Sequence, residues 1–413
     1  MELSKYSFGI GDRFGMQGSN QLKAFINLAE QGISVTPVWN KSHREHSTVG
    51  TEPLSVMEEA KNAVHETDWK DPYHVDADHI TLQTVYDYLE HADFFTIDVA
   101  AQIGVHLGRE EMDHYLEFFS PFSGSMQIGG SVSCEVDDTM LRKLGNNYWK
   151  AAVEAGKIYS VISEVKGTNA FIAEISMDEV PQPQNPVDLF FILKMMELNG
   201  VRLQTIAPRF PGKFNKGIDY IGNPDEFETV FRQYLTVVKS AISHFKLPEN
   251  LKLSIHTGSD KFSLYPIMNR LIKEQNMGIH VKTAGTTWLE EAIGLAESGG
   301  EASEFIADIY SQAYHRIDEL TANYSTVLSI DRAELKLPEV FSALSPADMA
   351  ATFRHDPQDM RYNPNIRQLM HTAYKIAGEN NRQFMRLVKR HQEIIGNNVY
   401  HNIMNRHLKP LFS

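Results

Sequence analysis

The chain has 413 residues, of which 42% are hydrophobic and 22% are charged, a composition typical of a globular protein with a large core. Its formal net charge of −14 argues against nucleic acid as a partner, because phosphate backbones need a basic face, and against an anionic membrane surface. Cys134 is the only cysteine, which excludes intramolecular disulfides, iron–sulfur clusters and cysteine-rich zinc sites.

Short strand-like segments alternate with amphipathic helical segments through the first two-thirds of the chain. The predicted strands cover residues 6–10, 34–39, 73–75, 94–99, 171–175, 202–207, 251–255 and 279–281. Leu22, Phe25 and Ala29 give the first helical pattern, which ends at Gly32, and a short helix is expected to end at His91. Successive strand–helix units predict an α/β protein with a (β/α)8 TIM-type barrel, whose active site lies at the carboxyl ends of the strands.

Two regions depart from this alternation. Residues 119–170 interrupt it with several glycines and a helix near 141–155, so we expect a long loop plus a helix there, and a lid is one interpretation. Beyond residue 301 the strand pattern disappears, and helices are predicted at 302–320, 348–353, 366–377 and 381–395. We therefore expect a barrel over residues 1–300, with the insertion at 119–170, and a C-terminal helical appendage over residues 301–413.

Asp76, Asp78 and His79 follow the third predicted strand. Carboxylates and an imidazole at one barrel rim are costly unless they pair or bind a ligand. An adjacent Asp-His pair can supply both a base and a metal ligand. The alternative is that the carboxylates are solvated loop residues beside a helix cap.

His256 precedes a turn that contains Gly258, Ser259 and Asp260, after the seventh predicted strand. The glycine allows the backbone to approach a ligand closely. The alternative is a core histidine with satisfied hydrogen bonds before an ordinary turn.

His280 and Lys282 lie on the same face of the eighth predicted strand, because side chains alternate along a strand. Thr283 follows, and the loop then opens a helix whose free N–H groups near residues 285–287 can bind an anion. The alternative is that Thr286 or Thr287 only caps that helix.

Other strand ends carry weaker candidates. They are Asp12, Arg13, Asn40, Lys41, Glu174 and Asp178. Arg209, Lys213 and Lys216 surround a Pro-Gly pair, and such a cationic cluster suits a carboxylate or a phosphate. A solvated run of surface charges is the alternative explanation.

Five segments at strand ends carry a resemblance to a known family. They are Gly9-Ile10-Gly11-Asp12-Arg13-Phe14-Gly15, Pro37-Val38-Trp39-Asn40-Lys41, Val75-Asp76-Ala77-Asp78-His79, His256-Thr257-Gly258-Ser259-Asp260-Lys261-Phe262 and Lys282-Thr283-Ala284-Gly285-Thr286. Together they resemble the tagaturonate epimerase family, over the barrel and the helical tail. The resemblance implies an isomerase of carbohydrate metabolism that interconverts tagaturonate and fructuronate, or the ketohexoses tagatose and fructose, with help from a divalent metal cation (zinc, nickel or manganese).

The carbon that such an epimerase inverts is β to the ketone, and simple enolisation reaches only the α carbon. One remaining route is transient oxidation by a nicotinamide, but Gly9-x-Gly11-x-x-x-Gly15 is one residue too long for a dinucleotide fingerprint. The other route is retro-aldol cleavage, rotation of the aldehyde fragment and re-addition, which needs a metal and a base.

The Asp-His and His-x-Gly-Ser segments also resemble the zinc site of class II sugar-bisphosphate aldolases. By that analogy Asp78 is the base, and His79 and His256 are metal ligands. His280 is expected to be the third ligand, with Glu174 as its competitor and as a second catalytic carboxylate. The expected substrate-binding residues are Asp12, Arg13, Asn40, Lys41, Asp76, Arg209, Ser259, Asp260, Lys282 and Thr283. For a substrate carboxylate, Lys282 with the nearby helix start is the first candidate, and Lys41 and Arg209 are the others.

Two other functions remain open. One is a class II-type sugar aldolase that releases the cleaved fragments, and the other is a non-catalytic partner subunit of such an aldolase. The expected partner is a small-molecule hexuronate or ketohexose, with no nucleic acid and no membrane, and with a homo-oligomer as an open option. No signal-peptide pattern and no run of about 18 apolar residues is visible, so a cytoplasmic location is expected.

Overall fold

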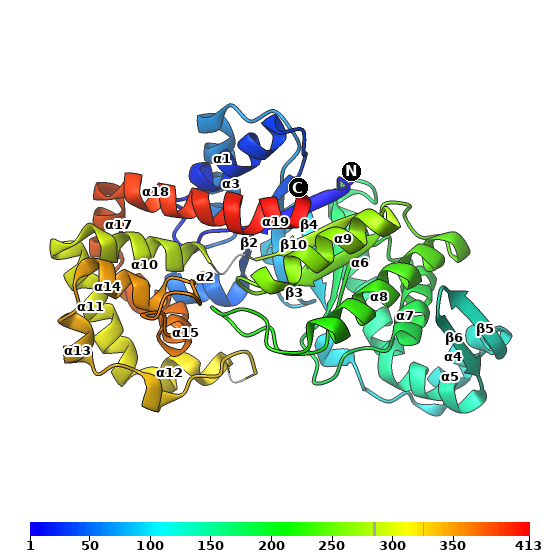
Figure 1. The fold of residues 1–413 in the computed structure, drawn as a ribbon. Helices are drawn as coiled ribbons and strands as arrows, with labels where there is room; N and C mark the ends of the chain where they lie inside the picture. Colours follow the sequence, from blue (N-terminus) through cyan, green and yellow to red (C-terminus); the bar gives the residue numbers. More distant parts are fainter. Residues whose placement is uncertain (284–285, 325) are drawn as a thin grey trace.

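Eight parallel strands form a closed barrel in the computed structural model, which describes residues 1–283, 286–324 and 326–413 and confirms the predicted fold class (Figure 1). The strands are β1 (Tyr6–Ile10), β2 (Thr36–Ser42), β3 (His74–Ile80), β4 (Phe94–Asp98), β7 (Ile172–Met177), β8 (Thr205–Pro208), β9 (Lys252–His256) and β10 (Ile279–Lys282). Around the barrel the order is β1-β10-β9-β8-β7-β4-β3-β2, and β10 closes on β1 with Ser7 opposite His280.

The barrel interior changes from apolar to polar along the strands. Leu3, Val38, Phe94 and Ile172 form a small buried cluster at the amino end. Because side chains alternate, residues two positions further along the strands face the same interior, and there the interior carries buried polar groups such as Thr96. The closed barrel therefore buries the apolar layer near the amino ends of its strands and presents polar side chains at their carboxyl ends.

Helices cover the outside of the barrel. They are α1 (Gly18–Glu30), α3 (Leu54–Thr67), α6 (Lys150–Lys166), α7 (Pro186–Leu198), α8 (Pro224–His244) and α9 (Tyr265–Gln275), whereas α2 (His43–Val49) directly follows β2 at the carboxyl end of the barrel. The side chains of Asn185 and Asn223 cap α7 and α8 by accepting a backbone N–H two residues later, and a proline begins each helix.

The third strand is longer than the sequence pattern predicts. β3 runs to Ile80 instead of ending at Val75, because its polar residues pair with β2, with Asp76 opposite Asn40. The helix expected to end at His91 is reduced to a single 3-10 turn. Polar residues inside a strand are tolerated here because the barrel interior supplies partners for them.

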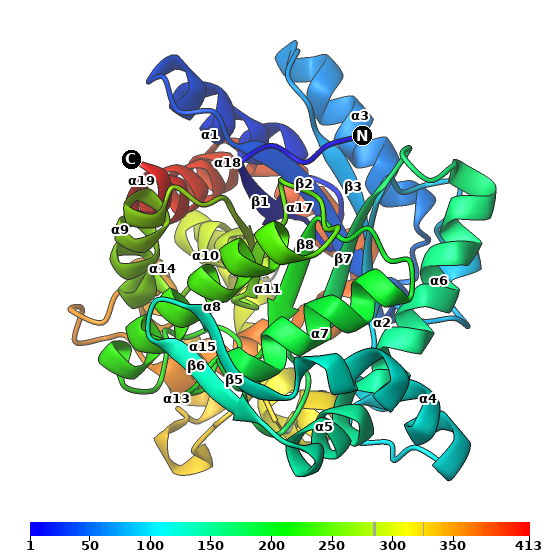
Figure 2. The ribbon, with the colours of Figure 1, turned by 90° about the vertical axis from the view of Figure 1, so that its right-hand side faces the viewer.

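The insertion between β4 and β7 contains a hairpin that the sequence pattern did not predict. It comprises α4 (Arg109–Phe119), the antiparallel strands β5 (Gly124–Gly129) and β6 (Val132–Val136), and α5 (Asp138–Leu144), before a π-helical turn leads into α6. The hairpin packs on the outer side of α7 and α8 (Figure 2). No side chain from residues 119–170 lines the pocket described below, so the described structure gives the insertion no position over the site.

The C-terminal region is helical, as expected. Its helices are α10 (Thr287–Ser298), α11 (Gly300–His315), α12 (Ile317–Thr321), α13 (Pro338–Ser342), α14 (Pro346–Phe353), α15 (Pro364–Thr372), α16 (Tyr374–Glu379), α17 (Asn381–Arg390), α18 (Gln392–His401) and α19 (Lys409–Phe412), with a π-helical segment over Asn402–Leu408. Trp288 of α10 belongs to the core of this helical layer, whereas Leu408 and Phe412 belong to the barrel core. The end of the chain packs on α1 and α9 and completes the outer ring of helices (Figures 1 and 2). Residues on both sides of position 300 therefore contribute to the barrel core and to the core of the C-terminal helices.

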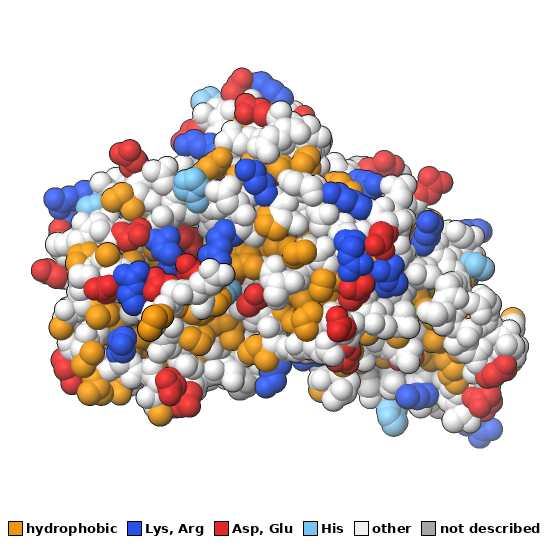
Figure 3. Space-filling view, viewed as in Figure 1, with side chains coloured by type: hydrophobic (Ala, Val, Ile, Leu, Met, Phe, Trp, Pro, Cys, Tyr) orange, Lys and Arg blue, Asp and Glu red, His pale blue; other side chains and the backbone are white. Residues whose placement is uncertain are grey.

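Acidic and basic side chains are interspersed on the face of the molecule drawn in Figure 3, and no large area of one sign stands out on it. Among the described residues, no helix combines the length and the apolar composition that crossing a membrane requires.

Candidate active site

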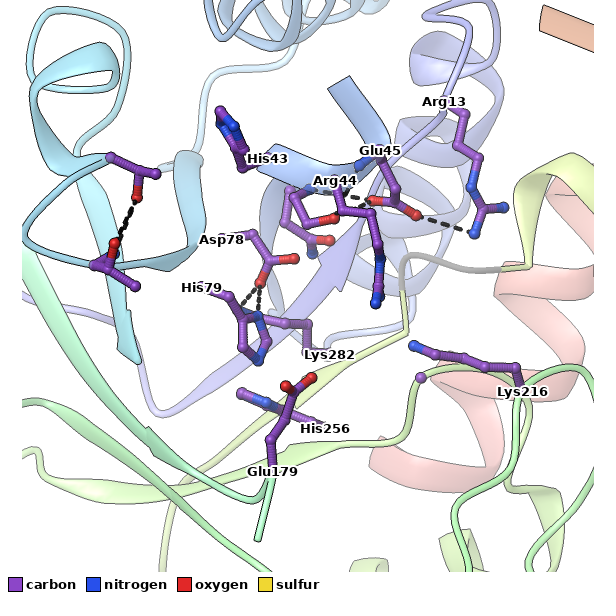
Figure 4. A pocket seen from close by; sticks show the side chains of 15 residues that line it. Arg13, His43, Arg44, Glu45, Asp78, His79, Glu179, Lys216, His256 and Lys282 are labelled. Carbon is purple, nitrogen blue, oxygen red and sulfur yellow. Dashed lines mark hydrogen bonds and ion pairs between the residues drawn. The ribbon is translucent and has the colours of Figure 1, made fainter. Parts of the chain in front are cut away.

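A pocket of about 330 Å³ lies at the carboxyl ends of the barrel strands (Figure 4). Its volume falls at the lower end of the usual range for small-molecule sites. The residues that line it are Arg13, Asn40, Ser42, His43, Arg44, Glu45, Asp78, His79, Thr81, Thr84, Glu179, Lys216, His256, Gly258 and Lys282.

Asp78 and His79 are consecutive residues of β3, yet both side chains face this pocket (Figure 4). His79 has φ +56°, and the pairing of β3 with β4 shifts register between Ala77 and Ile80. Regular alternation would send one of the two side chains to the opposite face. A left-handed conformation is strained for a residue with a Cβ atom, and such strain is often found at functional sites.

Two histidines that line the pocket form a cluster with an aspartate. His79, Asp178 and His256 offer ligand atoms that all lie within 4.8 Å of one another. Asp178 Oδ1 is 3.1 Å from His256 Nδ1 and 4.0 Å from His79 Nε2. Burial alone would raise the pKa of Asp178, but His256 and His79 lower it below its usual value.

Each histidine of the cluster uses its other ring nitrogen on a buried carboxylate. His79 Nδ1 is 2.7 Å from Asp78 Oδ1, and His256 Nε2 is 2.7 Å from Glu174 Oε1. Burial alone would lower the pKa of His256, but Asp178 and Glu174 outweigh it and raise this pKa to about 10. Metal-ligating histidines in proteins usually have such a carboxylate behind them, which fixes the ring orientation.

Lys282 lies beneath the cluster and is surrounded by carboxylates. Its Nζ is 2.6 Å from Asp76, 2.8 Å from Asp78 and 3.4 Å from Glu174, and it also donates to Thr96 Oγ1. Burial alone would lower the pKa of Lys282, but the three carboxylates raise it well above its usual value. Burial raises the pKa of Asp76 to about 7. The charge of Lys282 is therefore already committed to protein groups.

The structure does not bring His280 to the cluster. His280 lies deeper in the barrel, where its Nδ1 is 2.9 Å from Ser7 Oγ and its ring packs on Phe94. Burial lowers the pKa of His280 to about 3, so it is a neutral core histidine. Asp178, which the sequence pattern offered only as a weak candidate, stands in the position expected for His280, while Glu174 supports His256 from behind.

Asp12 and Lys41 serve the local backbone instead of lining the pocket. The carboxylate of Asp12 accepts N–H groups from Phe14 and Gln17, which shapes the turn before α1. Lys41 Nζ donates to the carbonyl of Arg13 at 2.6 Å. Arg13 does line the pocket.

Two residues predicted to bind substrate hold the turn after β9 in place. Ser259 Oγ accepts the N–H of Gly217 at 2.8 Å. Asp260 is fully buried and bonds to Arg367 at 2.7 Å and to His355 at 2.9 Å. Both residues are therefore structural in this geometry.

Arg209 and Thr283 also support backbone near the site. Arg209 donates to the carbonyl of Asp178 at 3.1 Å, and Thr283 Oγ1 donates to the carbonyl of Gly9 at 3.4 Å. The anion site expected around Gly285 falls partly outside the described residues.

The sequence pattern missed three charged residues of the pocket and offered a fourth, Lys216, only within a cationic cluster suited to a carboxylate or a phosphate. Arg44 and Glu45 belong to α2, where Ser42 and Glu45 form a capping box that marks a helix start and says nothing of a pocket. Glu179 lies in the loop after β7, and Lys216 lies in the loop after β8.

Comparisons with known proteins agree on one family. A sequence profile described as tagaturonate epimerase matches residues 1–411. A Thermotoga maritima protein described as tagaturonate/fructuronate epimerase is 27% identical over 383 residues, which cover 89% of this chain and 72% of that protein.

Solved structures show the same fold. A glycerol-complexed fructuronate-tagaturonate epimerase from Cohnella laeviribosi superposes with a TM-score of 0.82 at 24% identity, over 100% of this chain and 82% of that one. A probable tagatose 6 phosphate kinase from Sinorhizobium meliloti 1021 gives a TM-score of 0.51 at 9% identity, over 98% of this chain and 100% of that one. At such identities these two likenesses speak for the fold alone.

Proposed function

The chain belongs to the tagaturonate epimerase family, and on that premise we propose that it interconverts tagaturonate and fructuronate. It is an epimerase, a type of isomerase. The neutral pair tagatose and fructose is the alternative substrate class. The observation that carries the proposal is the cluster of His79, His256 and Asp178, with a buried carboxylate behind each histidine.

This cluster fits a divalent cation. Two imidazole nitrogens and one carboxylate oxygen form a donor set that zinc, nickel and manganese accept, and a set of only three protein donors would leave room for substrate oxygens. When bound, the cation supplies Lewis acidity toward the carbonyl and hydroxyl oxygens of the substrate. His79 and His256 would hold it in place, with Asp178 as the third ligand.

Retro-aldol cleavage is the route that this set of side chains suits. A base takes the proton of the hydroxyl on the carbon β to the ketone. The bond between that carbon and the α carbon then breaks, and its electron pair passes into an enediolate while the hydroxyl oxygen becomes an aldehyde. After the aldehyde rotates, the same two carbons rejoin from the other face and the proton returns to the oxygen. No atom is gained or lost, so the product is the epimer.

Asp78 is the proposed proton acceptor. Its Oδ1 is held by His79 and Lys282, and no hydrogen bond to its Oδ2 is present in the part of the chain that the structure describes. Burial would raise the pKa of Asp78, but Lys282 and His79 hold it well below its usual range, so the group is ionised at neutral pH. Glu179 also faces the pocket and is the competing acceptor.

Lys282 is proposed to keep Asp78 ionised and in place beside the substrate. Its ammonium is 2.8 Å from Asp78 Oδ1 and lines the pocket, and its charge lowers the pKa of that carboxyl.

The deciding experiment is incubation of the metal-loaded protein with tagaturonate, fructuronate, tagatose and fructose, with products resolved by NMR. Formation of fructuronate from tagaturonate, and of tagaturonate from fructuronate, is expected. A coupled assay for free aldehyde tests the aldolase alternative, in which cleaved fragments leave the site. A protein that converts none of the four sugars would contradict the proposal and would favour the non-catalytic subunit.

A further inference from the structure

Lys216 differs from Lys282 in having no partner for its charge. Lys282 is bound by carboxylates, but no hydrogen bond or ion pair to Lys216 Nζ is present among the residues that the structure describes. Lys216 lines the pocket, and Figure 4 shows its side chain extending toward it. Among the described residues, the Lys216 ammonium is therefore a cation at the site that a ligand can bind without displacing a protein partner.

The turn after β9 gives Lys216 its position. Gly258 has φ +64°, and a Cβ atom built there would lie 3.0 Å from Lys216 Nζ and 3.3 Å from its Cδ. A larger residue there would crowd the lysine and strain the backbone, so glycine suits the turn that Lys216 crosses. Gly258 lies two residues after His256, and Lys216 lines the same pocket as His79 and His256 of the predicted metal cluster.

The loop that carries this lysine is fastened on both sides of it. Ser259 accepts the N–H of Gly217 at 2.8 Å. Lys261 Nζ donates to the carbonyls of Asn215 at 3.0 Å and Ile218 at 2.8 Å. A fixed loop keeps the backbone of the lysine in place, which lowers the entropic cost of binding a ligand.

The charges around Lys216 favour an anion between them. Arg44 lines the same pocket and stacks over Tyr324, and its charge together with burial lowers the pKa of Lys216. Of the further cations that line the pocket, Arg13 is paired with Glu45 at 3.0 Å and Lys282 is bound by carboxylates. Two unneutralised cations facing one pocket repel each other, and a bound carboxylate relieves that repulsion.

We propose that Lys216, assisted by Arg44, binds the carboxylate of the hexuronate and thereby sets the preference for an acidic over a neutral sugar. This inference rests on the proposed epimerase function and names the specificity residue of the same site. Glu179 faces the pocket as well, and its negative charge disfavours a carboxylate placed close to it. The carboxylate is therefore placed on the side of the pocket where Lys216 and Arg44 lie.

The test compares Lys216→Met with Lys216→Arg and with Lys213→Met, which removes an exposed lysine from the same loop. Lys216→Met is expected to raise the KM for tagaturonate by about ten- to a hundredfold, with a smaller change in kcat, because one charge-assisted hydrogen bond is lost. Lys216→Arg should recover most of the affinity, and Lys213→Met should resemble the wild type.

Binding measured by calorimetry on the metal-loaded protein separates this inference from the proposed function. Tagaturonate affinity should fall in Lys216→Met while tagatose affinity stays within about twofold. Suppose that the wild type epimerises hexuronates. If Lys216→Met then keeps its affinity for tagaturonate, or loses affinity for tagatose by the same factor, the inference is wrong and the function stands. If the wild type binds hexuronates through Lys216 but converts none, the function is wrong and the inference stands. A wild type that binds neither sugar overturns both.

Discussion

Arg367 and Asp260 form a 2.7 Å ion pair in which both side chains are fully buried. The pair joins α15 of the helical layer to the turn after β9, across 107 residues of sequence. Arg367 also donates to the carbonyls of Gly217 and Phe353. One arginine thus connects the helical layer to the loop that carries Lys216, so the C-terminal helices help to shape the barrel mouth.

Glu290 of α10 is buried near this pair. Because Arg367 is paired with Asp260, its charge does not offset the effect of burial on the pKa of Glu290. Burial raises the pKa of Glu290 from 4.5 to about 7. The folded protein then holds this proton more tightly than the unfolded chain, so the contribution of Glu290 to the free energy of unfolding falls as the pH rises from about 4.5 to 7. Glu290→Gln, which has no such proton to lose, should be more stable than the wild type at pH 8, by on the order of 3 kcal/mol at most.

Thermal unfolding midpoints at pH 5 and pH 8 check this expectation. The advantage of Glu290→Gln should shrink at pH 5, where the wild type keeps its proton. Glu297→Gln, an exposed position of the same helix, is the control and should show no gain that depends on pH. A Glu290→Gln variant that is less stable at pH 8 than at pH 5, relative to the wild type, would contradict the buried-acid explanation.

The metal cluster makes a prediction that separates His79 and His256 from His280. His79→Ala and His256→Ala should each lose stoichiometric metal and activity while keeping the fold, since each removes one donor from a set of three. His280→Gln should keep its metal, because His280 contacts Ser7 and lies below the cluster. Elemental analysis and circular dichroism are the measurements. If both alanine variants retain their metal, or if only His280→Gln loses it, the cluster is not the metal site and the proposed mechanism is wrong on this point.

Asp78→Asn tests the proton acceptor. At saturating metal, kcat should fall by about 10²–10⁴-fold, the range of a lost general base. Saturating metal is needed because Asp78 also supports His79, and loss of such a support weakens metal binding by about 10–100-fold. Glu179→Gln is the matched variant and should retain most of the rate. The reverse result, with a slow Glu179→Gln and a fast Asp78→Asn, would move the role to Glu179.

The sequence predicted the barrel because alternating strand and helix patterns are local, and it predicted His79 and His256 because both stand at strand ends. It could not predict how deep a side chain lies. His280 does share a strand face with Lys282, but the register of β10 against β1 places it beside Ser7, one layer below the site. Asp260 shows the same limit, because its partner Arg367 lies far along the chain.

Lys282→Met should behave differently from Lys216→Met, although both remove one lysine from one pocket. Removing Lys282 leaves Asp76, Asp78 and Glu174 in a buried site without their shared cation, and an uncompensated buried charge typically costs about 3–5 kcal/mol. Lys282→Met should therefore lower kcat/KM by the same factor for tagaturonate and for tagatose. If only one of the two sugars reacts, the binding affinity for both sugars should fall by the same factor instead. Circular dichroism and metal content, with Lys282→Arg as the variant that keeps the charge, separate a damaged site from an unfolded protein. A loss confined to the hexuronate would instead assign the substrate carboxylate to Lys282 and take it from Lys216.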